Sequence, residues 1–170
     1  MHNQLANNST APNARKSPSK FMVFSLRDNL YCMPLSMVKE VISLPTITTV
    51  PDVPNFIRGL INLRGQIISV IDLRKKLKMP SKDLDPKKTS IIISQAEDVI
   101  IGAIVDDVVE VRSIDLEKIE DSIESRSSHN EYVSGIVKVE DEKLILLIDF
   151  VKLFNDRELF IVKNSIKKAS

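Results

Sequence analysis

Residues 56–77, FIRGLINLRGQIISVIDLRKKL, and residues 132–154, YVSGIVKVEDEKLILLIDFVKLF, are two versions of one pattern. The positions that match are Phe56 and Tyr132, Gly59 and Gly135, and Asp72 and Asp149. The second copy carries one extra residue in its polar middle, where a hairpin turn tolerates an insertion. An internal repeat of this length predicts two related structural units.

The repeat extends upstream through a shared V-x-E-V motif. Its first copy is Val38, Glu40 and Val41, and its second is Val108, Glu110 and Val111. Around these motifs the chain is a series of short Val- and Ile-rich runs bounded by charged turns, which is typical of β-strands. The runs are residues 21–35, 38–44, 61–73, 89–95, 99–111, 132–140 and 143–150.

Each repeat therefore predicts about five short strands followed by a short helix. The helices are expected at 73–77 and 150–154, with Asp72 and Asp149 as their N-caps. Closing five strands into a barrel removes exposed sheet edges, so we expect a mainly β fold of two barrels packed side by side. Their approximate bounds are 21–85 and 86–155, and the sequence leaves open whether the chain crosses between them. A sandwich with a similar number of strands is the competing geometry.

The two ends of the chain differ from this β region. Residues 1–20 contain almost no large apolar side chains, and we expect a disordered N-terminal tail. Residues 156–170 form a C-terminal extension in which the stretch 156–166, DRELFIVKNSI, fits either a helix or a strand.

Composition disfavours several classes of function. The 24 Lys and Arg residues balance 23 Asp and Glu residues, which gives no basic footprint for nucleic acid. Two histidines and the single cysteine, Cys32, do not supply a metal cluster, and we expect no metal or cofactor. Cys32, lying in a strand, is expected to be buried and inert. The lone cysteine and the absence of a long apolar run or secretion signal favour a cytoplasmic protein without membrane insertion.

Three stretches carry a resemblance to a known family: GLINLRGQIISVIDLRKKL, IGAIVDDVVEV and YVSGIVKVEDEKLILLIDF. Together, over about residues 20–155, they resemble CheW-like domains. The sequence departs from that family at Ser69, where proline is common. The resemblance implies two intertwined, SH3-like five-stranded barrels. It also implies a non-enzymatic adaptor that binds the cytoplasmic tips of chemoreceptors and the regulatory domain of the histidine kinase CheA, in arrays at the membrane.

Arg64 is the first candidate for a contact residue, because it lies beside Gly65 in a tight hairpin turn. Arginine is a favoured interface anchor. The competing interpretation is an internal ion pair, with Glu40 as the candidate partner. Asn62 and Arg64 are replaced by Lys138 and Glu140 in the second copy, and residues present in one copy are where function is expected to have diverged.

The resemblance also implies an apolar groove between the barrels that holds the receptor tip, with Arg64 as a receptor contact. We assign Val38, Ile42, Asn62, Arg64, Ile104 and Val111 to this groove, although core positions are the alternative for such valines. Gly59 and Gly135, present in both copies, are expected to have structural roles. Asp106 and Asp107 are expected in a solvated turn.

Two functions of other classes compete with the adaptor. A small enzyme that uses carboxylates would need acids that converge in one pocket, and a nucleic-acid-binding barrel would need basic residues interleaved with aromatic ones.

Overall fold

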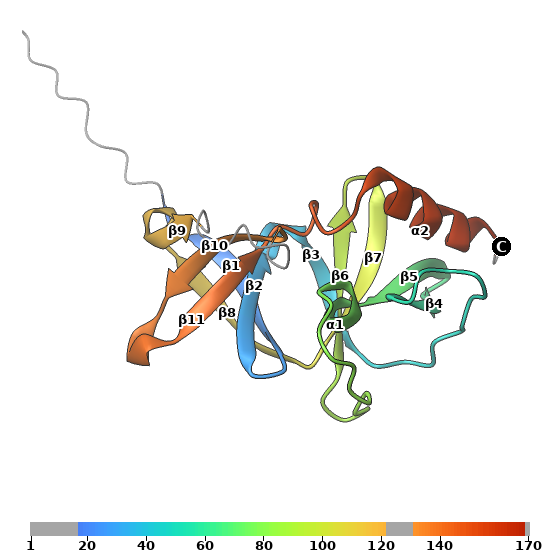
Figure 1. Cartoon of the computed structure of the whole chain (residues 1–170), viewed down its shortest axis with the longest axis horizontal. Helices are drawn as coiled ribbons and strands as arrows, with labels where there is room; N and C mark the ends of the chain where they lie inside the picture. Colours follow the sequence, from blue (N-terminus) through green and yellow to red (C-terminus); the bar gives the residue numbers. More distant parts are fainter. Residues whose placement is uncertain (1–16, 122–130, 169–170) are drawn as a thin grey trace, which may run out of the picture.

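Residues 17–121 and 131–168 are described in a computed structural model of the chain, and their strands form two sheets that lie side by side (Figure 1). The first is a six-stranded sheet in the order β8-β1-β2-β11-β10-β9, and the second is five-stranded in the order β3-β6-β7-β5-β4. The mainly β fold expected from the sequence is confirmed, with one strand more than expected in the first sheet.

The strands of the first sheet are β1 (Ser19–Leu26), β2 (Asn29–Pro34), β8 (Asp107–Ile114), β9 (Ile119–Asp121), β10 (Val133–Lys138) and β11 (Leu144–Ile148). Those of the second sheet are β3 (Val38–Ser43), β4 (Ile57–Leu63), β5 (Gln66–Asp72), β6 (Ser90–Ala96) and β7 (Val99–Val105). Short 3-10 turns η1 (Leu35–Met37), η2 (Leu116–Lys118) and η4 (Glu140–Glu142) join some of them.

The expected division of the barrels at residues 85 and 86 is wrong, because each sheet takes strands from both repeats. The first repeat supplies β1 and β2 to the first sheet, and then β3, β4 and β5 to the second. The second repeat supplies β6 and β7 to the second sheet before β8, β10 and β11 return to the first. The repeats are thus intertwined, and the chain passes between the sheets after β2 and again after β7.

The alignment of the two repeats is confirmed in backbone detail. Asp72 donates its N–H to the carbonyl of Phe56 at 2.7 Å, and Asp149 donates to that of Tyr132 at 2.9 Å. The β4–β5 and β10–β11 ladders shift register at matching places, between Ile57 and Gly59 and between Val133 and Gly135. The extra residue of the second copy lies in the hairpin turn, as expected from the sequence.

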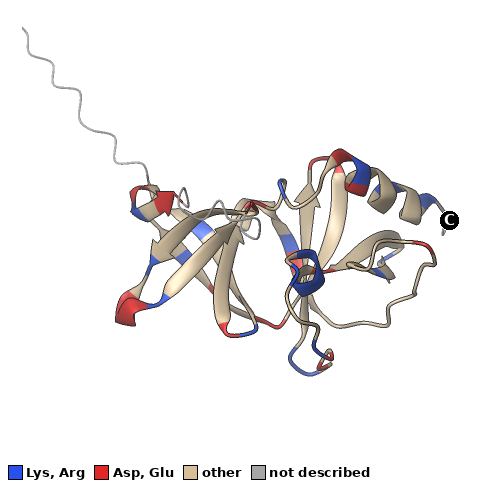
Figure 2. Cartoon of the chain, in the orientation of Figure 1, with Lys and Arg blue, Asp and Glu red and all other residues tan. Residues whose placement is uncertain are grey.

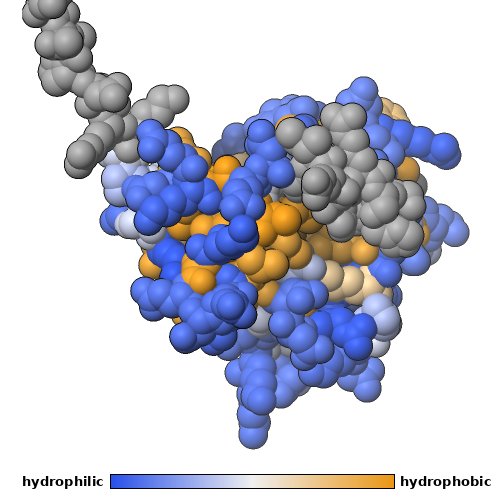
Figure 3. Space-filling view, turned by 60° about the vertical axis from the view of Figure 1, so that its left-hand side comes forward, coloured by the Kyte–Doolittle hydropathy of each residue, from blue (hydrophilic) through white to orange (hydrophobic). Residues whose placement is uncertain are grey.

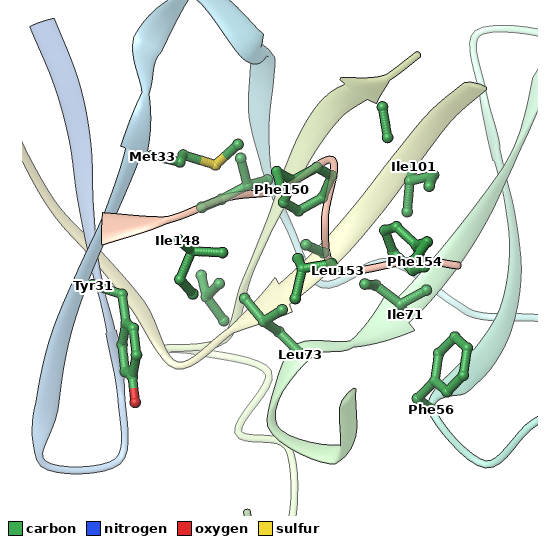
Figure 4. Close-up of a cluster of buried hydrophobic side chains, with 14 of the residues drawn as sticks. Tyr31, Met33, Phe56, Ile71, Leu73, Ile101, Ile148, Phe150, Leu153 and Phe154 are labelled. Carbon is green, nitrogen blue, oxygen red and sulfur yellow. The ribbon is translucent and has the colours of Figure 1, made fainter. Parts of the chain in front are cut away.

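Buried apolar side chains form three clusters, and their arrangement explains the continuous apolar runs of the strands. One cluster, which includes Val23 and Cys32, belongs to the first sheet, and another, which includes Val70 and Ile91, belongs to the second. A third and larger cluster contains residues of both sheets, among them Tyr31, Met33, Ile71, Ile101 and Ile148 (Figure 4). Strand faces therefore alternate between a sheet's own cluster and the shared one, which a sandwich with solvated outer faces would not show.

The helices predicted after the two aspartate caps have different outcomes. Helix α1 (Leu73–Lys76) forms, and the Asp72 carboxylate accepts from the N–H groups of Arg74 and Lys75. Residues 150–154 form turns, so the second helix is wrong there, although the Asp149 carboxylate still accepts from the N–H groups of Val151 and Lys152.

The C-terminal extension, which fitted either a helix or a strand, forms helix α2 (Asp156–Lys168). Asn155 and Glu158 cap it reciprocally, each side chain accepting from the other's backbone N–H at 2.8 and 3.0 Å. Leu159 and Val162 of α2 are buried in the shared cluster, so the extension is part of the core. Of the expected disordered tail, residues 1–16 lie outside the described residues, and Ser19 and Lys20 begin β1.

Candidate functional site

Arg64 and Gly65 form the tight turn between β4 and β5. Leu63 pairs with Gln66, which leaves a two-residue loop, and both loop residues have positive φ, 52° for Arg64 and 86° for Gly65. A turn of this kind requires left-handed backbone at both positions, and glycine adopts it at little cost. The Asn62 carboxamide oxygen accepts from the Gly65 N–H at 2.8 Å, so Asn62 fixes the turn that displays Arg64.

The Arg64 guanidinium makes a bidentate ion pair with Glu40 of β3. Its Nη1 and Nη2 lie 2.7 and 2.9 Å from the two carboxylate oxygens. These hydrogen bonds hold the pKa of Glu40 below its usual value and raise that of Arg64. The internal partner expected from the sequence is confirmed, yet the Arg64 side chain remains 74% exposed. Glu40 thus holds Nη1 and Nη2 of the guanidinium, while most of the side chain is exposed to solvent.

Gly59 and Gly135 are constrained by close neighbours. Gly59 has φ of 145°, and a Cβ there would collide with the carbonyl group of Thr48. A Cβ on Gly135 would collide with the side chain of Ile119. Close backbone approach explains the glycine at both matched positions.

The two V-x-E-V motifs lie on edge strands of different sheets and present their valines in the same way. Val41 pairs with Ile92 of the shared cluster, and Val111 pairs with Met22 of that cluster. Directly paired residues point to the same face of a sheet, so the valines face the layer between the sheets. We name Val38, Val41, Val108 and Val111 the four-valine set.

Burial also matches across the set. Val38 and Val108 are half-buried against the shared cluster, whereas Val41 and Val111 are 38% and 51% exposed. These exposed valines continue the shared apolar layer out to solvent. Apolar surface likewise gathers in the middle of one face of the molecule, ringed by hydrophilic residues (Figure 3).

The structure separates the remaining groove candidates from this set. Ile104 is buried inside the second sheet, and Ile42 packs against the same inner cluster. Both pair with Ile91, which faces that interior. The groove assignment of Ile104 is therefore wrong, because its side chain is 1% exposed. Val38 and Val111 face the inter-sheet layer, as a groove there requires.

Asp106 is a residue whose role the sequence did not reveal. It follows β7, where the chain returns to the first sheet, and its carboxylate lies 3.3 Å from Nε of Arg74. Its other oxygen accepts from the backbone N–H of Arg27, in the β1–β2 turn, at 2.6 Å. The Arg74 side chain is 2% exposed and that of Asp106 is 21% exposed. Asp106 thus lies at a bend, as expected, but it is partly buried in an ion pair and not fully solvated. The sequence around Asp106 does not indicate this partner, because Arg74 lies far away along the chain.

Lys76 is a second such residue. Its ammonium donates to both Glu158 oxygens, at 2.7 and 2.8 Å, and lies 4.7 Å from the Phe56 ring centroid and 5.4 Å from that of Tyr132. The lysine thus joins α1 to α2 and to the matched aromatic residues of both repeats. Burial and a hydrogen bond with Glu131 raise the pKa of Tyr132 to about 12, so its phenol stays protonated.

Chemistry-bearing groups outside these contacts are sparse. Within residues 17–121 and 131–168, His, Cys, Asp and Glu side chains do not gather in a group of three that could hold a metal ion. Cys32 is buried, as expected, and burial raises the pKa of its thiol to about 12. The same ranges contain no helix with the length and apolar character needed to cross a membrane.

Comparisons with known proteins agree with this architecture. Residues 20–158 match the model of the CheW-like domain. The chain is 34% identical to a chemotaxis protein CheW of Bacillus subtilis over 135 residues, which cover 79% of this chain and 85% of that one. It is 30% identical to a chemotaxis protein CheW of Klebsiella aerogenes over 149 residues, 87% of this chain and 89% of that one.

A solved structure is similar as well. The crystal structure of the scaffolding protein TtCheW from Thermoanaerobacter tengcongensis superposes with a TM-score of 0.76 at 39% identity, covering 83% of this chain and 95% of that one. The family match spans both intertwined repeats and the start of α2. This chain therefore belongs to the CheW-like family.

Proposed function

We propose that the protein is a chemotaxis scaffold that joins chemoreceptors to the histidine kinase CheA. The observation that carries this proposal is the family match over residues 20–158, together with its likeness to a solved scaffolding protein at a TM-score of 0.76. A scaffold of this kind acts by binding its partners and requires no catalytic site. Among the described residues, no specific feature favours either the carboxylate-based enzyme or the nucleic-acid-binding barrel.

The receptor-binding surface in this proposal is the layer between the sheets where the four-valine set reaches solvent. An amphipathic helical tip buries its apolar face in a groove of this kind. Val38 and Val111 supply apolar contact, and Arg64, ordered by Glu40 and Asn62, stands beside β3 as a polar contact. Ile42 and Ile104 support this surface from inside the second sheet and do not contact the receptor.

The kinase-binding surface is proposed at the outer ends of the two sheets. The resemblance implies that the regulatory domain of CheA has the same fold. The ends of the sheets of this protein would then dock pseudo-symmetrically on the corresponding ends of that domain. One of these ends is the β10–β11 turn, where η4 exposes Glu140, Asp141 and Glu142 (Figure 2). Through these partners the protein would reside in the cytoplasm at receptor arrays.

The test is reconstitution from purified components. A receptor signalling fragment, CheA and this protein are mixed, and both complex formation and kinase autophosphorylation are measured. The proposal expects a ternary complex and a rise in autophosphorylation that depends on all three proteins. Failure of the chain to bind the receptor fragment, or binding without any change in kinase activity, would contradict it.

A further inference from the structure

A cavity of about 600 Å³ opens where α1, the start of α2 and the segment before β10 meet. Its apolar walls are Phe56, Met79 and Tyr132, and its rim carries Lys75 and Lys78. Phe56 leads into β4 of the second sheet, whereas Tyr132 leads into β10 of the first. The cavity therefore lies at the junction of the two sheets, a preferred place for binding sites. It is separate from the four-valine set on the edge strands.

The charge of this cavity is positive. Lys76 and Glu158 neutralise each other in its wall, and the Lys76 side chain is 6% exposed. Within the described part of the chain, Lys75 and Lys78 have no carboxylate within ion-pair distance. The lining of the cavity therefore includes two lysines without a carboxylate partner as well as the side chains of Phe56, Met79 and Tyr132.

Positive charge also continues beyond the rim. Basic residues cover α1, and more follow in the loop that leads to β6 (Figure 2). In that loop Lys82, Lys87 and Lys88 are exposed, against Asp83 and Asp85. The three lysines outnumber these two aspartates by one, so a small excess of positive charge adjoins a cavity with both polar and apolar lining. A ligand that carries both carboxylates and apolar groups matches such a lining better than a single small anion.

We propose that this cavity binds an acidic peptide segment of a partner protein, with an apolar side chain in the cavity and carboxylates on Lys75 and Lys78. Glu158 already shows how a carboxylate is received here, held by a lysine that lies against aromatic rings. A peptide fits better than nucleic acid or a lipid surface, because the whole chain has a formal net charge of +1 and the lining combines apolar with charged side chains. Such a peptide would contact residues next to strands of both sheets at once.

The experiment measures binding of a fluorescein-labelled synthetic peptide in which pairs of glutamates alternate with leucines. The same peptide with glutamines is the first control. The variant Lys75→Gln/Lys78→Gln is compared with Lys39→Gln/Lys143→Gln, which removes equal charge from exposed lysines elsewhere. All proteins are checked for unchanged thermal melting, because Lys75 is half-buried in α1 whereas Lys39, Lys78 and Lys143 are exposed.

The proposal expects the glutamate peptide to bind and the glutamine peptide not to bind. The rim variant should lose about tenfold in affinity, and the control variant should bind like the wild type. Equal losses in both variants would mean that net charge alone attracts the peptide, and would overturn the proposal. So would no binding of the glutamate peptide, or binding of phosphatidylglycerol vesicles in its place. None of these outcomes depends on receptor or kinase binding, so they are distinguishable from failure of the scaffold function.

Discussion

Arg74 and Asp106 form an ion pair that joins the two sheets, with Nε and Oδ1 3.3 Å apart. Arg74 belongs to α1, which follows the second sheet, and Asp106 stands where the chain enters the first. Asp106 also holds the β1–β2 turn through the Arg27 N–H. Nη1 of Arg74 is buried without a hydrogen-bond partner among the described residues, so Asp106 is the main compensation for its charge.

Removing Asp106 should therefore destabilise the whole fold. Asp106→Asn keeps the shape but leaves a buried guanidinium without a counter-charge, and we expect a loss of about 3 kcal/mol in the free energy of unfolding. Urea denaturation measures it. Glu120→Gln, which removes the exposed pair with Lys138, is the control and should cost less than about 1 kcal/mol. Equal losses in the two variants would show that the Arg74 pair has no special role.

Arg64→Ala should weaken receptor binding and leave the melting temperature within a few degrees of the wild type. The Arg64–Glu40 pair is exposed, and such pairs contribute little to stability. Binding is measured by co-sedimentation with a receptor fragment. The companion variant Glu40→Gln keeps the Arg64 guanidinium but removes its ion pair. We expect its loss of receptor affinity to lie between that of Arg64→Ala and none. A large drop in melting temperature for Arg64→Ala would favour the purely structural interpretation.

Val111→Glu should reduce receptor binding at least tenfold without unfolding the protein. Its side chain is 51% exposed, so a charge there is tolerated in the free protein but would be buried in a helix-in-groove complex. Leu144→Glu, at 48% exposure on β11, is the matched control for the loss of an exposed apolar residue. If the two substitutions had equal effects on receptor affinity, the four-valine set would not be the binding surface.

Ser69→Ala should loosen α2. The fully buried Ser69 hydroxyl donates to the carbonyl of Val162 in α2 at 3.2 Å, and its loss should cost about 1 kcal/mol. Hydrogen exchange should accelerate at the amides of α2. Ser134 makes a similar bond to Leu147 from an exposed position, so Ser134→Ala should leave the free energy of unfolding nearly unchanged.

The Glu40 carboxyl should titrate with a pKa below its usual value of 4.5, because the Arg64 guanidinium hydrogen-bonds to its charged form. A pKa that is lower in the folded state gives a stabilising contribution that is present above the unfolded-state pKa. That contribution is lost as the pH falls through the folded-state pKa. Carboxyl ¹³C NMR measures the midpoint, and Arg64→Ala should return it towards 4.5. An unchanged midpoint in that variant would show that Arg64 is not the cause of the shift.

Part of the site's internal geometry was predictable from the sequence, and the errors have different causes. The bidentate partner of Arg64 was predictable because charge and turn position favour Glu40, and the matched valines were visible from the repeat. Ile104 was misassigned because an apolar run that is buried on both faces gives no alternation to show which side chain points where. Asn155 followed three residues later by Glu158 was a readable capping signal that would have identified α2 as a helix.

Residue spacing and local backbone preference were enough to predict most strands, their duplication and the hairpin turns, but not β9, which lies in a polar stretch of the second repeat. The three-dimensional arrangement was needed to show which strands the two repeats exchange and which valines reach solvent. It was also needed to show that Asp106 pairs with Arg74 and Lys76 with Glu158. Such contacts join residues far apart along the chain, and their energy depends on burial and on a partner's exact distance, which no local pattern encodes.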